Sequence, residues 1–348
     1  MSYNYTYYLP FERNFDPVAP TIWMQENWTK SLVYSAVYVI LCFGGQHLMK
    51  SRPAYNLKGP LIIWNLCLAI FSIFGMVRFA PDFFYVIWTH GFQFSICVCS
   101  YAHGVTAYWT QAFAMSKVLE LGDTAFIVLR KRPLMFLHWY HHITVLVYTW
   151  HAFKDHTAAG RWFIFMNYTV HSVMYTYYTL RAMGFRIPKI VAMTVTTMQL
   201  SQMVVGIIVN VSTYRIKLAG EECRQTWENL YVAMAMYGSY FLLFAHFFYK
   251  AYFVSARYDG PAAGKKGEKK PIKTEMMNGA AANGELHHDE KNGEIIQGRN
   301  GNPAANGYVK SALKQLDEYM GNVEKNGVIV GNGEAAKKGL RNRQVNHE

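Results

Sequence analysis

The chain has 348 residues, of which 52% are hydrophobic, 16% are aromatic and only 16% are charged. This composition excludes an ordinary soluble protein with a charged surface and favours an integral membrane protein. The formal net charge is +12, and +10 of it falls on residues 1–258. Because those basic residues alternate with apolar segments instead of forming one face, they do not indicate a protein that binds nucleic acid.

Residues 1–30 lack the pattern of a cleavable signal peptide, so we expect the first membrane span to act as an uncleaved signal. Seven segments follow that are apolar and long enough to cross the hydrocarbon core, which takes about 20 residues each. They cover residues 31–49, 60–80, 107–129, 134–151, 162–183, 188–211 and 229–254. A weaker apolar run over residues 83–100 predicts a partly helical lumenal loop, with an eighth span as the alternative.

Basic residues predict the orientation, since short cytoplasmic loops of membrane proteins collect lysine and arginine. They gather between alternate spans, at residues 50–58, 130–132 and 181–189, whereas residues 81–106 contain none. We therefore expect a lumenal N-terminus and a cytosolic C-terminus.

This pattern predicts that the chain has three parts. Residues 1–30 form a lumenal segment, and residues 31–258 form an all-α membrane domain of seven transmembrane helices. Residues 259–348 are poor in aromatic residues and rich in Gly, Asn, Ala and Lys, which predicts a disordered, basic cytosolic tail.

The predicted lumenal regions contain candidates for covalent modification. Of four N-glycosylation sequons, those at Asn4 and Asn27 fall in the lumen and clear of a span, so we expect glycosylation there. The five cysteines match no zinc or redox motif. Cys97, Cys99 and Cys223 lie on the lumenal side, where disulfides persist. A disulfide between Cys97 and Cys223 is our prediction, with Cys99 as the competing partner.

The third span contains the sequence KVLELGDT. Helical spacing puts Lys117, Glu120 and Thr124 on one face and Asp123 about a quarter-turn away. Ionisable residues inside a span are costly and are therefore candidates for function. One explanation is a Lys117–Glu120 ion pair that only fixes helix packing. The other is a polar cavity that opens toward a charged cytosolic substrate.

The fourth span contains HWYHH, in which His138, His141 and His142 project into one sector of the helix. Clustered imidazoles either bind a transition metal or act as nucleophile and general base. A membrane di-iron oxygenase needs several histidine clusters, whereas this chain has one. We therefore expect no metal site.

The fifth and sixth spans add further polar side chains. One stripe of the fifth span consists of Asn167, His171, Tyr175 and Tyr178. An amide one turn from an imidazole can fix its tautomer by bonding one ring nitrogen. In the sixth span, Gln199 and Gln202 are three residues apart and can hydrogen-bond between helices. Packing alone is the competing explanation for the tyrosines and glutamines.

Taken in order, KVLELGDT, HWYHH, HSVMYTYY and TTMQLSQ resemble the motifs of the ELO family of fatty acid elongases, and the resemblance covers about residues 30–255. The form HWYHHITVLVYTW is similar to the subfamily that extends saturated and monounsaturated long-chain acyl groups. The resemblance implies a multi-pass protein of the endoplasmic reticulum membrane. Six of its helices would form a barrel around a narrow acyl tunnel, with the seventh outside.

The implied activity is that of a very-long-chain 3-oxoacyl-CoA synthase, an acyltransferase without a cofactor. It condenses a long-chain acyl-CoA with malonyl-CoA and releases CoA and carbon dioxide. His141 would carry the acyl group as an acyl-imidazole, His171 would lie beside the reacting carbonyl, and Asn167 would orient His171. Residues implied to line or support the site are His138, His142, Lys117, Glu120, Asp123, Tyr175, Tyr178, Gln199 and Gln202.

The predicted cytosolic loop Arg130, Lys131 and Arg132 is suited to hold CoA phosphates, although topology alone also explains its charge. Expected partners are acyl-CoA, malonyl-CoA, membrane lipid and the ketoacyl-CoA reductase, dehydratase and enoyl reductase of the elongation cycle. A homodimer is one option. Two other classes stay open: a metal oxygenase would contain stoichiometric iron, and a seven-span receptor or transporter would tolerate His141→Ala without losing a reaction.

Overall fold

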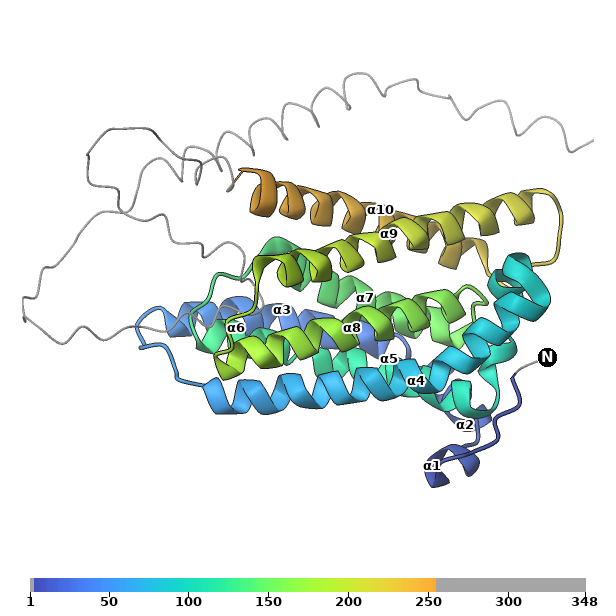
Figure 1. Cartoon of the computed structure of the whole chain (residues 1–348), viewed down its shortest axis with the longest axis horizontal. Helices are drawn as coiled ribbons and strands as arrows, with labels where there is room; N and C mark the ends of the chain where they lie inside the picture. The colour runs from blue at the N-terminus through green and yellow to red at the C-terminus, as the bar shows by residue number, and fades with distance from the viewer. Residues whose placement is uncertain (1–2, 255–348) are drawn as a thin grey trace, which may run out of the picture. The chain divides into compact units, whose positions relative to one another are not determined.

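A computed structural model of the chain describes residues 3–254, and within that range every regular element is helical (Figure 1). The elements are α1 (Pro10–Arg13), α2 (Val18–Asn27), α3 (Lys30–Met49), α4 (Lys58–Cys97), η1 (Ser100–Ala102), α5 (Gly104–Glu120), α6 (Asp123–Leu129), α7 (Phe136–Lys154), α8 (Gly160–Met183), α9 (Lys189–Leu218), α10 (Trp227–Phe248) and η2 (Tyr249–Val254). The predicted tail, residues 259–348, lies outside the described residues.

Four helices are long and apolar enough to cross a membrane: α3, α4, α9, and α10 with its continuation to Phe253. The prediction of an all-helical membrane protein is therefore confirmed. The other predicted spans fall on α5 with α6, on α7 and on α8. Helix α5 is short, with 17 residues, while α7 and α8 carry many polar side chains. Polar groups are tolerated in such helices when they face the interior of a bundle.

Helix α4 differs from the prediction, because it has 40 residues and continues to Cys97. Residues 83–97 are therefore helical except at Gly91, more regular than the partly helical loop that we predicted, and their lumenal side stays a prediction. The predicted span ended at residue 80, just before Pro81, but this proline lies inside α4. The backbone leaves the helical conformation at Gly91, with φ of 80°, which glycine adopts without steric cost.

The third predicted span is interrupted, since α5 ends at Glu120 and α6 begins at Asp123. Gly122 lies at the break, and a Cβ atom there would come within 2.7 Å of the Trp64 ring. The backbone stays right-handed helical at Leu121 and Gly122, and its hydrogen bonds join residues three apart, such as the Gly122 N–H and the Leu119 carbonyl at 2.8 Å. Thr124, in the first turn of α6, contacts His138, with 2.9 Å between Oγ1 and Nε2.

The long helices run side by side, and six of them contact one another in sequence (Figure 1). Helix α4 packs on α5, α5 on α7, α7 on α10, α10 on α9, α9 on α8, and α8 on α4. Helix α3 packs on α6 and α7. Glycines permit the closest approaches: a Cβ at Gly75 would lie 2.3 Å from the Tyr168 ring, and one at Gly206 would lie 2.2 Å from the Tyr237 ring.

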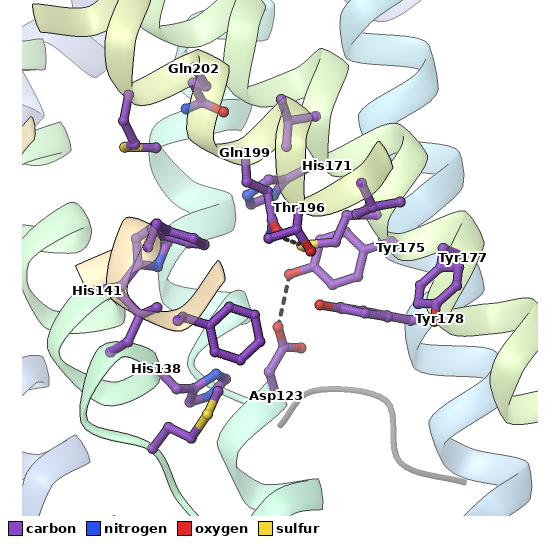
Figure 2. A pocket seen from close by; sticks show the side chains of 18 of the residues that line it. Asp123, His138, His141, His171, Tyr175, Tyr177, Tyr178, Thr196, Gln199 and Gln202 are labelled. Carbon is purple, nitrogen blue, oxygen red and sulfur yellow. Dashed lines mark hydrogen bonds between the residues drawn. The ribbon is translucent and has the colours of Figure 1, made fainter. Parts of the chain in front are cut away.

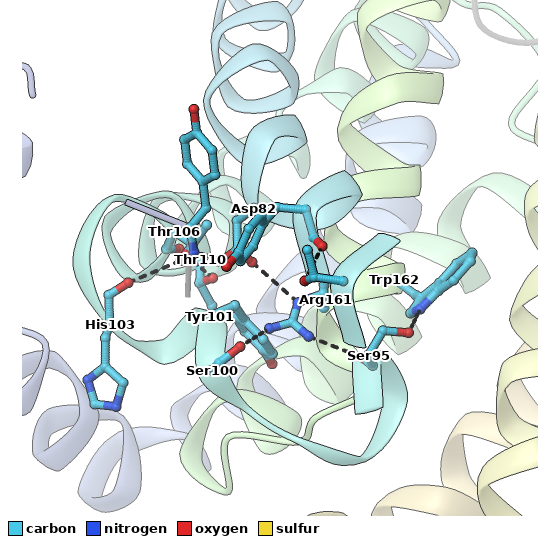
Figure 3. A network of polar contacts seen from close by, with 12 residues as sticks. Asp82, Ser95, Ser100, Tyr101, His103, Thr106, Thr110, Arg161 and Trp162 are labelled. Carbon is cyan, nitrogen blue, oxygen red and sulfur yellow. Dashed lines mark hydrogen bonds and ion pairs between the residues drawn. The ribbon is translucent and has the colours of Figure 1, made fainter. Parts of the chain in front are cut away.

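A buried polar network joins α4 to the first turn of α8 (Figure 3). The side chains of Arg161 and Asp82 are fully buried, with 3.4 Å between Nε and Oδ2. The same guanidinium donates to the Ser95 carbonyl at 3.4 Å and to the Ser100 hydroxyl. It also lies 5.6 Å from the Tyr101 ring. This network fixes the second half of α4 against α8.

A disulfide links Cys97, at the end of α4, to Cys223, in the segment before α10, across a sequence separation of 126 residues. Cys99 is free and buried. Of the two predicted glycosylation sites, Asn4 is exposed outside any helix. Asn27 is the last residue of α2 and donates its side-chain amide to the Trp23 carbonyl at 2.7 Å.

The N-terminal segment is anchored to the bundle by polar contacts. Glu12 is buried and accepts hydrogen bonds from Arg78 and from the indole of Trp109, both at 2.8 Å to Oε1. His156, in the turn after α7, lies 2.8 Å from the Thr21 hydroxyl. Burial, followed by nearby Arg224 and His103, lowers the pKa of His156 below its usual value.

Candidate active site

A pocket of about 160 Å³ opens among α5 to α10. Figure 2 shows His138 and His141 of α7 opposite His171 and Tyr175 of α8, with Gln199 and Gln202 of α9 nearby. The pocket gathers most of the sequence-predicted site residues. Those that line it are Glu120, Asp123, His138, His141, His142, Asn167, His171, Tyr175, Tyr178, Gln199 and Gln202. The four motifs, separate in the chain, therefore converge on one cavity.

Lys117 does not line the pocket but lies behind it, 2% exposed. Its ammonium group donates to Glu120 Oε1 at 2.7 Å and to Asn167 Oδ1 at 2.9 Å. The other end of the Asn167 amide lies 3.1 Å from His171 Nε2. The opposite ring nitrogen, Nδ1, is 3.9 Å from Glu120 Oε1. These four side chains form one continuous polar chain between α5 and α8.

The three histidines of α7 have different surroundings. His138 is hydrogen-bonded to the Thr124 hydroxyl, which also lies 2.6 Å from the Tyr38 hydroxyl. The Nδ1 atom of His142 is buried and has no hydrogen bond within residues 3–254. The ring of His141 borders the pocket and makes no hydrogen bond to the described part of the chain, whereas its backbone carbonyl accepts from the Thr144 hydroxyl. His142 also borders the pocket but is only 6% exposed, so of the three His141 combines unengaged ring nitrogens with the greater accessibility.

Asp123 is held at the pocket wall by two donors. The Trp64 indole donates to Oδ1 at 2.5 Å, and the Tyr175 hydroxyl donates to Oδ2 at 2.8 Å. The Tyr175 proton is thereby committed to the carboxylate. Asp123 is the first residue of α6, and its bond to Tyr175 joins α6 to α8.

The opposite wall is apolar and was not predicted from the sequence. It is made by side chains of α9, α10 and η2, among them Val195, Met203, Phe244, Phe247 and Ala251. The spacing of Phe244, Phe247 and Ala251 puts them on one helical face. That signal was present in the sequence, but an apolar stripe within a membrane span is usually lipid contact or packing.

The basic loop after α6 does not line the pocket. Lys131 has a φ of 53° and donates to the carbonyls of Lys50 and Arg52, at 3.2 and 3.1 Å. Its ammonium group therefore binds backbone carbonyls of the segment that follows α3. Arg130 and Arg132 follow directly from α6, the helix that also supplies Asp123.

Fold and site together define an all-helical integral membrane protein whose polar groups, rich in histidine, face an apolar wall across a buried pocket. Residues 23–259 match the ELO family, described as the GNS1/SUR4 family. The chain therefore belongs to the ELO family.

Relatives agree with this assignment. The chain is 54% identical over 280 residues to putative fatty acid elongase 3 of Caenorhabditis elegans, covering 79% of this chain and 87% of the relative. It is 50% identical over 253 residues to very long chain fatty acid elongase 6 of Drosophila melanogaster, with coverage of 72% and 80%. For the protein of that name in Homo sapiens, identity is 47% over 243 residues, with coverage of 70% and 91%.

Proposed function

We propose that this fatty acid elongase is a 3-oxoacyl-CoA synthase that forms an acyl-imidazole on His141. One observation carries the proposal: the His141 ring reaches the pocket with no hydrogen bond to the described chain, while His171 and Glu120 line the same cavity. A neutral imidazole without a competing donor has a lone pair ready for attack on a thioester. His138 is less suited to this role because its Nε2 is paired with Thr124.

The proposed reaction proceeds in two balanced steps. First, a ring nitrogen of neutral His141 attacks the acyl thioester, the C–S bond breaks, and CoA leaves as the thiol with the imidazole proton. Second, malonyl-CoA loses carbon dioxide, its enolate carbon attacks the acyl carbonyl, and the C–N bond to His141 breaks. One proton from the medium restores the neutral imidazole. Division into two steps lets CoA leave before malonyl-CoA enters.

The negative charge that develops on oxygen in both steps needs hydrogen-bond donors. Tyr175 is a poor candidate because its proton is given to Asp123. The Gln199 amide contacts the Met174 sulfur at 3.2 Å, and thioether sulfur is a weak acceptor. Gln202 lines the same side of the pocket. We therefore assign the oxyanion contacts to Gln199 and Gln202, together with a ring N–H of His171, which lines the same pocket.

We assign substrate placement from the order of the helices. The closed sequence of contacts α4, α5, α7, α10, α9 and α8 supports a six-helix barrel around an acyl tunnel, with α3 outside. The basic loop Arg130–Arg132 begins seven residues after Asp123, about 10 Å along a helix, and is proposed to take CoA phosphates. The motif with Trp139 and Tyr140 resembles that of the subfamily acting on saturated and monounsaturated acyl chains, which we propose as substrates.

The cellular setting is also proposed. A disulfide between Cys97 and Cys223 suits an oxidising lumen at that end of the chain, and the basic residues favour a cytosolic C-terminus in the endoplasmic reticulum membrane. A 3-oxoacyl-CoA must be reduced, dehydrated and reduced again before the next condensation. A ketoacyl-CoA reductase, a dehydratase and an enoyl reductase are therefore the proposed partners.

Incubation of purified protein with acyl-CoA alone tests the acyl-imidazole. Peptide mass spectrometry should find the acyl mass on His141, and malonyl-CoA should discharge it to 3-oxoacyl-CoA without added metal and in the presence of a chelator. His141→Ala should abolish both. His246→Ala is a matched control, because His246 is exposed on α10 and outside the pocket. Full condensation by His141→Ala would disprove the assignment, and chelator-sensitive activity with stoichiometric iron would favour an oxygenase.

A further inference from the structure

The polar chain behind the pocket contains a lysine that needs an explanation. Lys117 is 2% exposed, and its ammonium group lies 4.2 Å from the Phe113 ring centre in addition to its contacts with Glu120 and Asn167. Burying a charge is costly unless each of its donors is used. An ion pair that only fixed α5 would need Glu120 alone, one turn away on the same helix. The bond to Asn167 instead crosses to α8.

This cross-helix bond determines which way the Asn167 amide points. A lysine ammonium group can donate but cannot accept, so the amide atom at 2.9 Å must be the oxygen. The amide nitrogen therefore faces His171 Nε2 at 3.1 Å. Without Lys117, a rotation of the amide by 180° would exchange the two atoms at similar cost, because they are nearly equal in size.

The amide orientation in turn determines the tautomer of His171. An N–H donor faces Nε2, so Nε2 is the unprotonated nitrogen and Nδ1 carries the proton. Nδ1 lies 3.9 Å from Glu120 Oε1, beyond hydrogen-bond length but close enough to favour an N–H over a lone pair. The second oxygen of Glu120 is buried without a hydrogen bond in the described part of the chain.

We propose that Lys117 is a positioning residue that, through Asn167, holds His171 as the Nδ1–H tautomer. This inference rests on the proposed function, because it gives His171 a fixed N–H donor beside the carbonyl that reacts on His141. Lys117 itself touches no substrate. Its role differs from packing, because it depends on the direction of a hydrogen bond and not on the volume that the side chain fills.

The variant Asn167→Asp distinguishes a positioning role of Lys117 from a purely structural ion pair. The variant keeps the volume and gives Lys117 a stronger partner, so a purely structural ion pair would be retained. A carboxylate has no N–H, however, and can only accept from His171. The proton should therefore move to Nε2. Loss of a correctly placed proton donor typically lowers a rate by about 100-fold or more, and we expect kcat to fall by that factor with KM for acyl-CoA unchanged.

The tautomer can be read directly by solid-state NMR of the full-length protein labelled with ¹⁵N-histidine in lipid bilayers. The His171 signals are assigned by their loss in His171→Gln. Wild type should show Nδ1 protonated and Nε2 bare, and Asn167→Asp should reverse the pair. Lys117→Met combined with Glu120→Gln, which keeps the buried charge balanced, should give a mixture of tautomers. Lys217→Met is the matched control, since Lys217 donates to the Gln225 carbonyl outside the pocket.

A proton on Nε2 in the wild type, or an unchanged tautomer and kcat in Asn167→Asp, would overturn the inference. The spectrum does not depend on catalysis. If the wild type shows the expected tautomer and Asn167→Asp reverses it, but no 3-oxoacyl-CoA forms, the positioning by Lys117 stands and the proposed condensation fails.

Discussion

Removal of Asp82 should strongly destabilise the protein. The change leaves the Arg161 guanidinium fully buried with no carboxylate, because the ion pair joins two side chains that are both 0% exposed. Breaking a buried pair by deleting one partner costs about 3–5 kcal/mol. A hydrogen bond from the Tyr3 amide, 3.1 Å from Oδ1, is lost as well. We expect Asp82→Ala to lower the unfolding free energy by about 4 kcal/mol.

For a domain of this size, such a loss corresponds to roughly 10 °C in the unfolding midpoint. Differential scanning fluorimetry in detergent measures it. The double variant Asp82→Leu with Arg161→Met removes both charges and should recover most of the loss, since apolar replacement of a buried pair is nearly neutral. Ten residues of α8, about 15 Å, separate Arg161 from His171, so folded protein should retain its condensation rate. A midpoint within 2 °C of wild type for Asp82→Ala, or a double variant as unstable as the single one, would refute this reasoning.

Further predictions concern packing, the disulfide and pH. Gly75→Ala should cost about 1–3 kcal/mol in thermal unfolding, because its Cβ would lie 2.3 Å from the Tyr168 ring and overpack α4 against α8; an unchanged midpoint would mean that the helices separate freely. Replacing Cys97 and Cys223 together by serine should cost about 4–5 kcal/mol, since their closure spans 126 residues, and reductant should reproduce the loss in wild type only. The folded pKa of His156 is lowered, so its neutral form stabilises the fold and that contribution is lost as pH falls below about 6.5. His156→Gln should flatten unfolding midpoints between pH 7.5 and 5, and an equally steep slope in the variant would assign the effect to other groups.

The helical class and the composition of the site could be predicted from the sequence because polar side chains are rare inside membrane spans. Such residues must meet one another, a cavity or a ligand, since hydrocarbon offers them no hydrogen bonds. Their spacing of three and four residues therefore indicated the inward face of each helix. Asn167 and His171, one turn apart on α8, are an example, and their side chains lie 3.1 Å apart in the fold.

Other features could not be predicted, because they depend on contacts between distant parts of the chain. Helical periodicity assumes one continuous helix, so it did not predict the turn at Gly122 against Trp64, or that Trp64 and Tyr175 would hold Asp123 at the pocket. The predicted second span likewise ended at residue 80, whereas α4 continues to Cys97. The apolar pocket wall on α10 could not be predicted, since packing residues and pocket residues are of the same types within an apolar span.

By itself, the sequence determined that this chain is a helical membrane protein with inward polar stripes, because the cost of exposing polar groups to lipid acts on every span separately. Only the tertiary structure decided what each polar side chain does. His138 is bonded to Thr124, His141 faces the pocket, and Lys117 reaches Asn167 on another helix. Spacing within one helix limits which residues share a face, but the direction of each hydrogen bond depends on the neighbouring helix that supplies the partner.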